Sequence, residues 1–417
     1  MTGHRLHNLL QENPIVVTGT GCLSAAGDSV AGLWASALAG KSLAAWREFQ
    51  IAGEPQQFAV STAPDLNASD PALHPVRRMD RCVQLAWLAA RQAWLQSGLE
   101  DAPSRAGIGL IVGSSRGPME RLEHGFRRVE APRYPPSLSA DCTFGSLSGA
   151  LAQALNLAGP TATVSATCAS GAYAIAFAAE QILLGKADIM IVGGTETPLH
   201  AAALVQLQAA GVLGSHETPQ MTCRPFDVTR NGLALGEGSA FLVLESAQSA
   251  ASRSARALAR LSGWSTNIDH SGRAGVTHDG SGIAESASQA LRLAGLNPPQ
   301  IDHINLHGTG TQLNDLAEAR AINRVFGAQA AALPCTSSKP VTGHCLGATP
   351  ALEAVLCIET LARQIIPPTA NCHELDPECA IELVTGSPRA ARINHVLSNS
   401  LGFWGYHASL IFSKADA

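Results

Sequence analysis

Apolar residues along the chain fall into short runs that are apolar on both faces, rather than into an alternating pattern. The runs are separated by stretches that favour helices, and Gly-rich turns follow several of them. This arrangement is typical of central strands covered by helices on both sides. The pattern predicts an α/β fold with strands at 15–18, 108–112, 162–165, 189–192, 240–244 and 301–306.

The length of the chain indicates how this pattern is divided. With 417 residues, it exceeds the size at which a single hydrophobic core usually stops growing. A segment rich in Ser, Ala and Arg, at 246–260, separates two similar successions of strands and helices. We therefore expect two closely packed halves, 1–255 and 256–417, although the sequence similarity between them is too weak to prove a duplication.

Composition narrows the range of partners. Only 15% of the residues are charged and 46% are apolar, a balance that suits extensive burial and favours a homo-oligomer. The net charge of −5 and the lack of a basic tract argue against nucleic acid or an anionic membrane as partner. No signal-like segment and no run of about 18 apolar residues occurs, so we expect a cytoplasmic protein that acts on small molecules.

The ten cysteines are scattered and form no CxxC pair, which indicates reduced thiols that mostly serve packing. Cys372, His373 and Cys379 lie close enough in sequence to suggest part of a zinc site, but no second half-site matches them. We therefore expect no metal.

One of these cysteines stands out by its position. Cys168 lies between an apolar strand-like run and a long run of small helix-forming residues that continues to about Leu184. At a helix start, backbone N–H groups and the helix dipole favour a thiolate and can hold an oxyanion, which indicates a nucleophile. The alternative is that Cys168 is a small buried hydrophobe, as cysteines often are.

Two histidines lie in glycine-containing loops of the second half. His307 directly follows the run 301–306 and opens the segment H-G-T-G-T, where the hydroxyls of Thr309 and Thr311 can hold a polar ligand arm or bond the turn. His344 precedes an apolar helix. Either histidine alone is more often a structural residue than a catalytic one.

A lysine shares the loop of the second histidine. Lys339 lies five residues before His344, and Glu353 lies early in the helix that follows. We expect Lys339 and Glu353 to form a buried ion pair that fixes the loop, with a surface pair as the alternative.

Together these segments resemble the motifs of one family. A cysteine in T-[AC]-C-x-S-G, then H-G-T-G-T, then S-K-x-x-x-G-H-x-x-G are signatures of the β-ketoacyl-acyl-carrier-protein synthases, and all three occur here in that order. Supporting stretches at 223–227, 236–238 and 399–403 extend the likeness over essentially the whole chain. The resemblance to type II fatty acid and polyketide ketosynthases implies a thiolase-like, five-layered αβαβα fold of two similar halves.

The same resemblance implies the chemistry. Cys168 would take an acyl chain from the phosphopantetheine thioester of an acyl carrier protein, with the backbone N–H groups of Cys168 and Phe403 as the oxyanion hole. Malonyl-carrier protein would then lose carbon dioxide, and His307 and His344 would stabilise the enolate. Lys339 and Glu353 would support this loop. No permanently bound cofactor is implied, since the carrier supplies the phosphopantetheine.

The resemblance also suggests binding residues. Thr309 and Thr311 would hydrogen-bond the pantetheine arm, and Arg77 and Arg78 match the patch that receives the acidic carrier protein. The alternative for the arginines is an ordinary solvated face. Three further candidates for this patch are Arg127, Arg128 and Arg133.

The chain departs from the family at several positions. The family's usual G-F-G-G-T-N segment has Trp404, Tyr406 and His407 here. We expect that Trp404 cannot adopt the backbone angles of glycine, which would change the movement of the loop and the access of the acyl chain. The alternative is that the ring of Trp404 fills a neighbouring void. Arg116 occupies a position where fatty-acid enzymes place an apolar residue, so it would meet a polar substrate terminus or a dimer interface. Asn314 replaces a glycine and tolerates left-handed turns.

These departures favour a decarboxylating condensing enzyme of a specialised type II polyketide or polyene pathway, acting as a homodimer or as a heterodimer with a ketosynthase-like partner. Three alternatives remain: a housekeeping fatty-acid elongation enzyme, a non-catalytic chain-length subunit of a ketosynthase heterodimer, and a thiolase-like enzyme that does not decarboxylate its substrate.

Overall fold

The computed structural model describes residues 3–101, 104–127, 135–270 and 272–416. All six predicted strands are present, although the last is shorter than expected because a 3₁₀ turn precedes it and the loop of His307 begins directly after it. Their bounds are β1 Ile15–Ser24, β4 Ile108–Gly113, β5 Thr161–Val164, β6 Ile189–Glu196, β8 Gly238–Ser246 and β10 His303–Asn305.

Within the described residues, eleven strands form one mixed sheet in the order β13-β11-β10-β15-β16-β9-β1-β8-β6-β4-β5. Strands β1 and β9 pair over only three residue pairs, from Ile15 with Leu261 to Val17 with Ala259. This short junction joins a first-half sheet, β5 to β1, to a second-half sheet, β9 to β13. The strands not yet given are β9 Ala259–Ile268, β11 Pro334–Thr336, β13 Glu382–Leu383, β15 His395–Gly402 and β16 Tyr406–Ser413.

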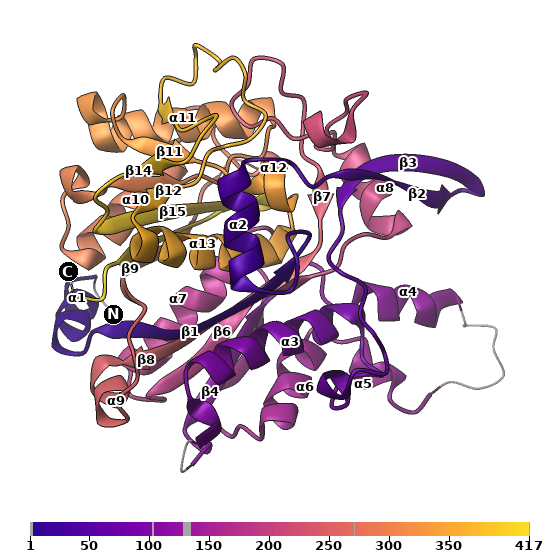
Figure 1. Ribbon diagram of the computed structural model, residues 1–417, viewed down its shortest axis with the longest axis vertical. Helices are drawn as coiled ribbons and strands as arrows, with labels where there is room; N and C mark the ends of the chain where they lie inside the picture. The colour runs from indigo at the N-terminus through magenta and orange to yellow at the C-terminus, as the bar shows by residue number, and fades with distance from the viewer. Residues whose placement is uncertain (1–2, 102–103, 128–134, 271, 417) are drawn as a thin grey trace.

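Helices fill three layers around the two parts of the sheet (Figure 1). Two helices lie between the parts and contact both of them, and further helices cover each outer face. This gives the expected five-layered αβαβα order. The inner pair is α7 Ser170–Leu183 and α13 Thr349–Arg363, the first outer face carries α3 Arg81–Gln96 and α6 Gly145–Leu155, and the second carries α10 Ser281–Ala294 and α11 Gln312–Phe326.

The middle layer explains the alanine-rich sequence of α7. A helix enclosed on both sides has no solvated face, and 11 of its 14 residues are buried. Small side chains such as Ala174 and Ala178 let both parts of the sheet approach the helix closely. The N-terminus of α7, with Cys168 just before it, is thereby held at the centre of the molecule.

The remaining elements lie around these layers, and a separate three-stranded sheet has the order β2-β3-β7. The division into 1–255 and 256–417 stays a prediction. None of the described helices has the length and apolar character needed to cross a membrane. The remaining bounds are α1 Gly3–Glu12, α2 Val30–Ala39, α4 Met119–Arg127, α5 Leu138–Asp141, α8 Ala201–Ala209, α9 Ala247–Ser252, α12 Lys339–Thr342, β2 Ala45–Ile51, β3 Glu54–Ser61, β7 Leu235–Gly236, β12 Ile365–Ile366 and β14 Arg389–Ala390.

Candidate active site

Cys168 lies on the tight turn that connects β5 to α7. The preceding residue, Thr167, has a left-handed backbone with φ of 51°, an unfavourable conformation for a β-branched residue. Ser170 braces the turn: its hydroxyl donates to the carbonyl of Thr167 at 2.5 Å and accepts from the N–H of Ala166 at 2.9 Å. This strained and braced backbone fixes the position of the Cys168 thiol.

The thiol of Cys168 is protonated at neutral pH. Burial raises the pKa of Cys168 to about 12, although the positive charge of Lys339 opposes the shift. The backbone N–H group at the helix start lowers the pKa of Cys168, in the expected direction, but the cost of removing the thiolate from water is larger. A nucleophilic Cys168 must pass its proton to a neighbouring base.

His307 and His344 lie beside each other, with ring centroids 5.3 Å apart and ring planes at 84°. Burial lowers the pKa of both imidazoles well below the ordinary value, and the charge of Lys339 lowers both further. Both rings are therefore neutral at pH 7. A neutral imidazole offers one N–H donor and one lone pair, so each ring can donate to an oxyanion or accept a proton.

A buried carboxylate fixes the backbone at His307. Glu318, on α11, accepts the N–H groups of His307 and Gly308 at 2.8 and 2.9 Å. Burial raises the pKa of Glu318 to about 7, while these two backbone donors lower it. Glu318 was not among the residues predicted from the sequence; its signal there is a Glu on the apolar side of a helix that follows the histidine motif.

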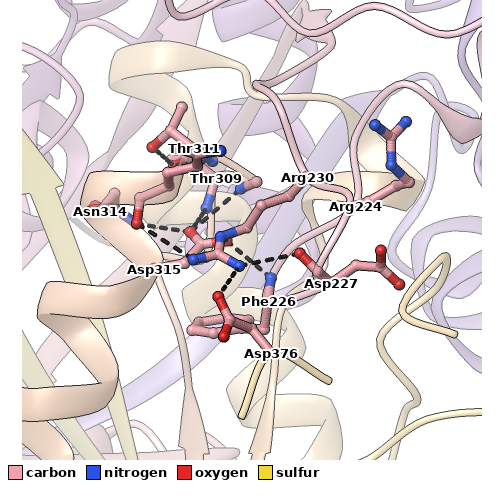
Figure 2. A network of polar contacts seen from close by, with 12 residues as sticks. Arg224, Phe226, Asp227, Arg230, Thr309, Thr311, Asn314, Asp315 and Asp376 are labelled. Atoms are coloured by element: carbon pink, nitrogen blue, oxygen red, sulfur yellow. Dashed lines mark hydrogen bonds and ion pairs between the residues drawn. The ribbon is translucent and has the colours of Figure 1, made fainter. Parts of the chain in front are cut away.

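A second carboxylate holds the rest of this loop, as Figure 2 shows. Asp315 accepts the N–H groups of Thr309 at 3.0 Å and of Phe226 at 2.8 Å, and its Oδ2 lies 3.6 Å from Nε of Arg230. The hydroxyls of Thr309 and Thr311 are 2.8 Å apart. Both threonines line the cavity described below, so their hydroxyls are available to a ligand as well as to each other.

The loop of His344 is fixed by the predicted ion pair. Nζ of Lys339 lies 2.7 Å from Oε1 of Glu353, and both side chains are fully buried, which rules out a surface pair. Burial raises the pKa of Glu353 to about 7 against the opposing effect of Lys339. The ring of His344 is oriented by a 3.1 Å hydrogen bond between its Nδ1 and the hydroxyl of Thr349.

A third buried carboxylate, also missed in the sequence, links the two halves. Glu196, the last residue of β6, accepts the N–H groups of Ser115 at 2.6 Å and Arg116 at 3.0 Å from the first half. It also accepts the N–H of Gly347, at 3.1 Å, from the loop that carries His344. Burial raises the pKa of Glu196 to about 7. Its signal in the sequence was an acidic residue four positions after the apolar run 189–192.

The three candidate catalytic side chains face a common cavity of about 750 Å³. Its walls come from both halves, and most of the residues that sequence analysis singled out for the substrate line it. These residues are Cys168, His307, His344, Thr309, Thr311, Phe403 and Trp404.

The backbone of Phe403 lies close to Cys168. A Cβ placed on Gly402 would lie 2.0 Å from the hydroxyl of Thr167 and 3.2 Å from the nitrogen of Cys168, so only glycine allows this approach. The hydroxyl of Thr167 also donates to the carbonyl of Phe403 at 3.4 Å. Two backbone segments thus meet beside the sulfur.

Trp404 does not behave as expected. Its backbone is left-handed, with φ of 67°, and its side chain is 53% exposed, so it both adopts a glycine-like conformation and fills no buried void. The exposed ring meets little steric opposition, and the left-handed conformation costs only about 1–2 kcal/mol.

Asn314 also differs from expectation, since it lies in the first turn of α11 and needs no left-handed backbone.

The remaining predicted residues lie away from the cavity. Arg116 is half-buried, and its guanidinium donates to Gln206 on α8 rather than lining the cavity. Arg77 and Arg78 are exposed just before α3, and their role as a carrier-protein patch stays a prediction. Arg128 and Arg133, like the side chain of Arg127, lie outside the described residues.

All ten cysteines are free thiols. Within the described residues, no group of three or more His, Cys, Asp or Glu side chains is arranged to hold a metal ion.

Comparison with known proteins defines the class. Residues 12–250 match the N-terminal domain of β-ketoacyl synthase, and residues 258–373 match its C-terminal domain. The chain belongs to the β-ketoacyl synthase family and is an enzyme of the acyltransferase class.

Among individual relatives, the chain is 34% identical to 3-oxoacyl-[acyl-carrier-protein] synthase 2 of Staphylococcus aureus strain COL, over 98% of this chain and 100% of that protein. It is similar to a chain in the structure of the ishigamide ketosynthase/chain length factor, with 31% identity, a TM-score of 0.87, and 96% and 99% of the two chains covered. A structure of a type II polyketide acyl-carrier protein with its hexaketide-bound ketosynthase matches with 27% identity, a TM-score of 0.87, and 97% and 100% covered.

Proposed function

We propose that this enzyme condenses an acyl group held on Cys168 with malonyl-carrier protein, with loss of carbon dioxide, in a specialised type II polyketide or polyene pathway. The observation that carries the proposal is the cavity itself: one thiol and two neutral imidazoles, contributed by distant segments, face the same space. The strained turn at Thr167 and the buried carboxylates hold this arrangement in place before substrate arrives.

The first step is acyl transfer. Cys168 gives its proton to a neutral imidazole, its sulfur attacks the thioester carbonyl of the acyl-carrier protein, and the pantetheine sulfur leaves and takes up that proton. The N–H groups of Cys168 and Phe403 stabilise the oxyanion of the intermediate. The close approach of Gly402 to Cys168 supports this pairing.

The second step is carbon–carbon bond formation. The bond between the malonyl carboxylate and its neighbouring carbon breaks, carbon dioxide leaves, and negative charge develops on the thioester oxygen. N–H groups of His307 and His344 stabilise this enolate, and the loss of one donor costs roughly 10²–10³ in rate by analogy with other oxyanion holes. The enolate carbon then attacks the acyl group, and the Cys168 sulfur leaves and takes up one proton from solvent, since its own proton left with the pantetheine thiol in the first step.

The partners follow from the same proposal. An acyl carrier protein supplies the phosphopantetheine arm, Thr309 and Thr311 bond this arm, and Arg77 and Arg78 receive the carrier. Two similar structures support these partners: one is a ketosynthase with its acyl-carrier protein, and the other is a ketosynthase with a chain length factor. We therefore expect an acyl carrier and either a homodimer or a heterodimer. We place the reaction in the cytoplasm.

Two departures from the family favour specialised over housekeeping substrates. Trp404 adds an exposed aromatic ring to the cavity, and Arg116 adds a charge whose field lowers the pKa of Cys168. We propose that Arg116, whose guanidinium lies outside the walls of the cavity and donates to Gln206, meets a polar acyl terminus that extends beyond these walls. The presence of Cys168 together with both histidines favours an active enzyme over a non-catalytic chain-length subunit.

The test is loading of the purified enzyme with a panel of acyl-carrier proteins, measured by intact-protein mass spectrometry. Wild type should gain the mass of the acyl group and Cys168→Ala should not. His307→Ala should still load but lose decarboxylation of malonyl-carrier protein by roughly 10²–10³. The absence of any adduct on wild type contradicts the proposal, and decarboxylation that requires a second subunit supports the chain-length alternative.

A further inference from the structure

Among the described residues, one cation lines a cavity that is otherwise neutral. Arg273, in the 3₁₀ segment Gly272–Ala274, is exposed, and its guanidinium carbon lies 5.7 Å from the ring centroid of Trp404. Trp404 lies in the separate segment Phe403–Gly405 and is 53% exposed. Since both residues line the cavity and both reach solvent, we call Arg273 and Trp404 the mouth of the cavity.

The two segments of the mouth are fastened to each other. The N–H of Asp269 donates to the carbonyl of Gly405 at 3.0 Å, and its carboxylate lies 2.8 Å from Nε2 of His407. Gly275, with φ of 89°, approaches so closely that a Cβ on it would lie 2.6 Å from the carbonyl oxygen of Gly402. Arg273 is therefore held beside Trp404 by the backbone as well as by the ring.

The charge of Arg273 is not neutralised. Of the described residues that line the cavity, Arg273 is the single Lys, Arg, Asp or Glu, and His307 and His344 are uncharged. In the part of the chain that the structure describes, no carboxylate pairs with its guanidinium. A guanidinium ordered on an aromatic face, without a counterion, is suited to bind a phosphate through parallel N–H donors.

We propose that Arg273, oriented by Trp404, binds the phosphate of the phosphopantetheine arm while the thioester end reacts at Cys168. The inference rests on the proposed function, because the carrier-bound substrate is what brings this phosphate. The thioester must reach the buried sulfur, so the opposite end of the arm, where the phosphate lies, remains toward the exposed residues of the cavity. The malonyl carboxylate, in contrast, departs beside the two histidines.

The experiment compares two small thioesters that differ only in this phosphate: acyl-phosphopantetheine and acyl-pantetheine, with the acyl group that loads best from the carrier panel. Wild type should load Cys168 from the phosphorylated compound about five- to tenfold more efficiently, as expected for one charge-assisted contact near solvent. The preference should fall as ionic strength rises, since screening weakens exposed charge pairs.

Arg273→Met should remove the preference by slowing loading from acyl-phosphopantetheine alone; unchanged loading from acyl-pantetheine shows that the variant is folded. The matched control is Arg363→Met, which removes an arginine that lies 5.6 Å over Trp34 and does not line the cavity. This control should keep the wild-type preference.

Several outcomes would overturn the inference. Equal use of the two thioesters by wild type excludes a phosphate contact while leaving the condensing activity intact. If Arg273→Met slows decarboxylation of malonyl-pantetheine, which has no phosphate, the residue binds the malonyl carboxylate instead. Failure of every thioester to load Cys168 counts against the proposed function, so the two failures are distinguishable.

Discussion

The deep end of the cavity and its mouth are built on different principles. At the deep end, Cys168, His307 and His344 are buried, and buried carboxylates or a buried ion pair hold the surrounding backbone. At the mouth, Arg273 and Trp404 are exposed and are held by a ring contact between short segments. We therefore expect the deep end to be sensitive to the loss of any partner, and the mouth to tolerate substitution.

Removal of Lys339 should have the largest effect on stability. Lys339→Met leaves Glu353 buried without its partner, and breaking a buried pair destabilises by about 3–5 kcal/mol. Thermal or denaturant unfolding measures the loss. The double variant Lys339→Met/Glu353→Gln should lose less than Lys339→Met alone, because no uncompensated charge remains.

An exposed ion pair provides the matched control for this prediction. Arg292 and Glu285 pair at 2.8 Å with side chains 63% and 53% exposed, so Arg292→Met should leave the unfolding midpoint nearly unchanged. Equal losses from Lys339→Met and Arg292→Met would remove the distinction between buried and exposed pairs.

A pH effect should report on the buried histidines. The pKa of His344 is depressed in the folded state, so below its ordinary value of 6.5 the unfolded chain binds a proton that the folded protein does not. Stability from this group is therefore present above pH 6.5 and is lost as the pH falls. The stability advantage of wild type over His344→Asn should shrink by about 1 kcal/mol between pH 6.5 and 5.5.

Unfolding curves of both proteins over this pH range provide the measurement. The carboxylates with raised pKa values, such as Glu196 and Glu318, occur in both proteins, so their opposite pH dependence cancels in the difference. A difference that stays constant or grows on acidification would contradict a neutral, buried His344.

The smallest effect is expected at the mouth. Trp404→Gly relieves a left-handed backbone worth about 1–2 kcal/mol, but it loses an exposed cation–π contact of about 0.5–1 kcal/mol and adds flexibility to the unfolded chain. These contributions nearly cancel, so the unfolding midpoint should hardly move. The preference for the phosphorylated thioester should weaken instead, since Arg273 loses the aromatic ring that orients it. A large loss of stability would contradict the expectation that the mouth tolerates substitution.

The same contrast explains what the sequence could predict. Six strands, Cys168, both histidines and the Lys339–Glu353 pair were predicted because each belongs to a local pattern: an apolar run, a helix start or a glycine-containing motif. The mouth could not be predicted, because Arg273 and Trp404 are 131 positions apart and only the fold brings them together.

One expectation failed, and the state of a second residue could not be predicted, for physical reasons that no local pattern contains. The protonated state of Cys168 depends on how completely the folded protein removes it from water, and burial outweighs the helix start. The left-handed backbone of Trp404 depends on the space around its exposed ring. Glu196 and Glu318 were missed because their partners are backbone N–H groups whose positions only the structure gives.

Glu196 has a consequence for how such an enzyme changes over time. Its carboxylate accepts the N–H of Arg116, in the loop after β4, and the N–H of Gly347, in the loop of His344. A mutation that reshapes the loop at Arg116 to admit a new acyl chain will therefore also shift the segment at Gly347, which positions the imidazole of His344. Substitutions at the mouth of the cavity are therefore the easier route to new substrates, because a residue there can be exchanged without disturbing the alignment of the Cys168 sulfur and the His344 ring.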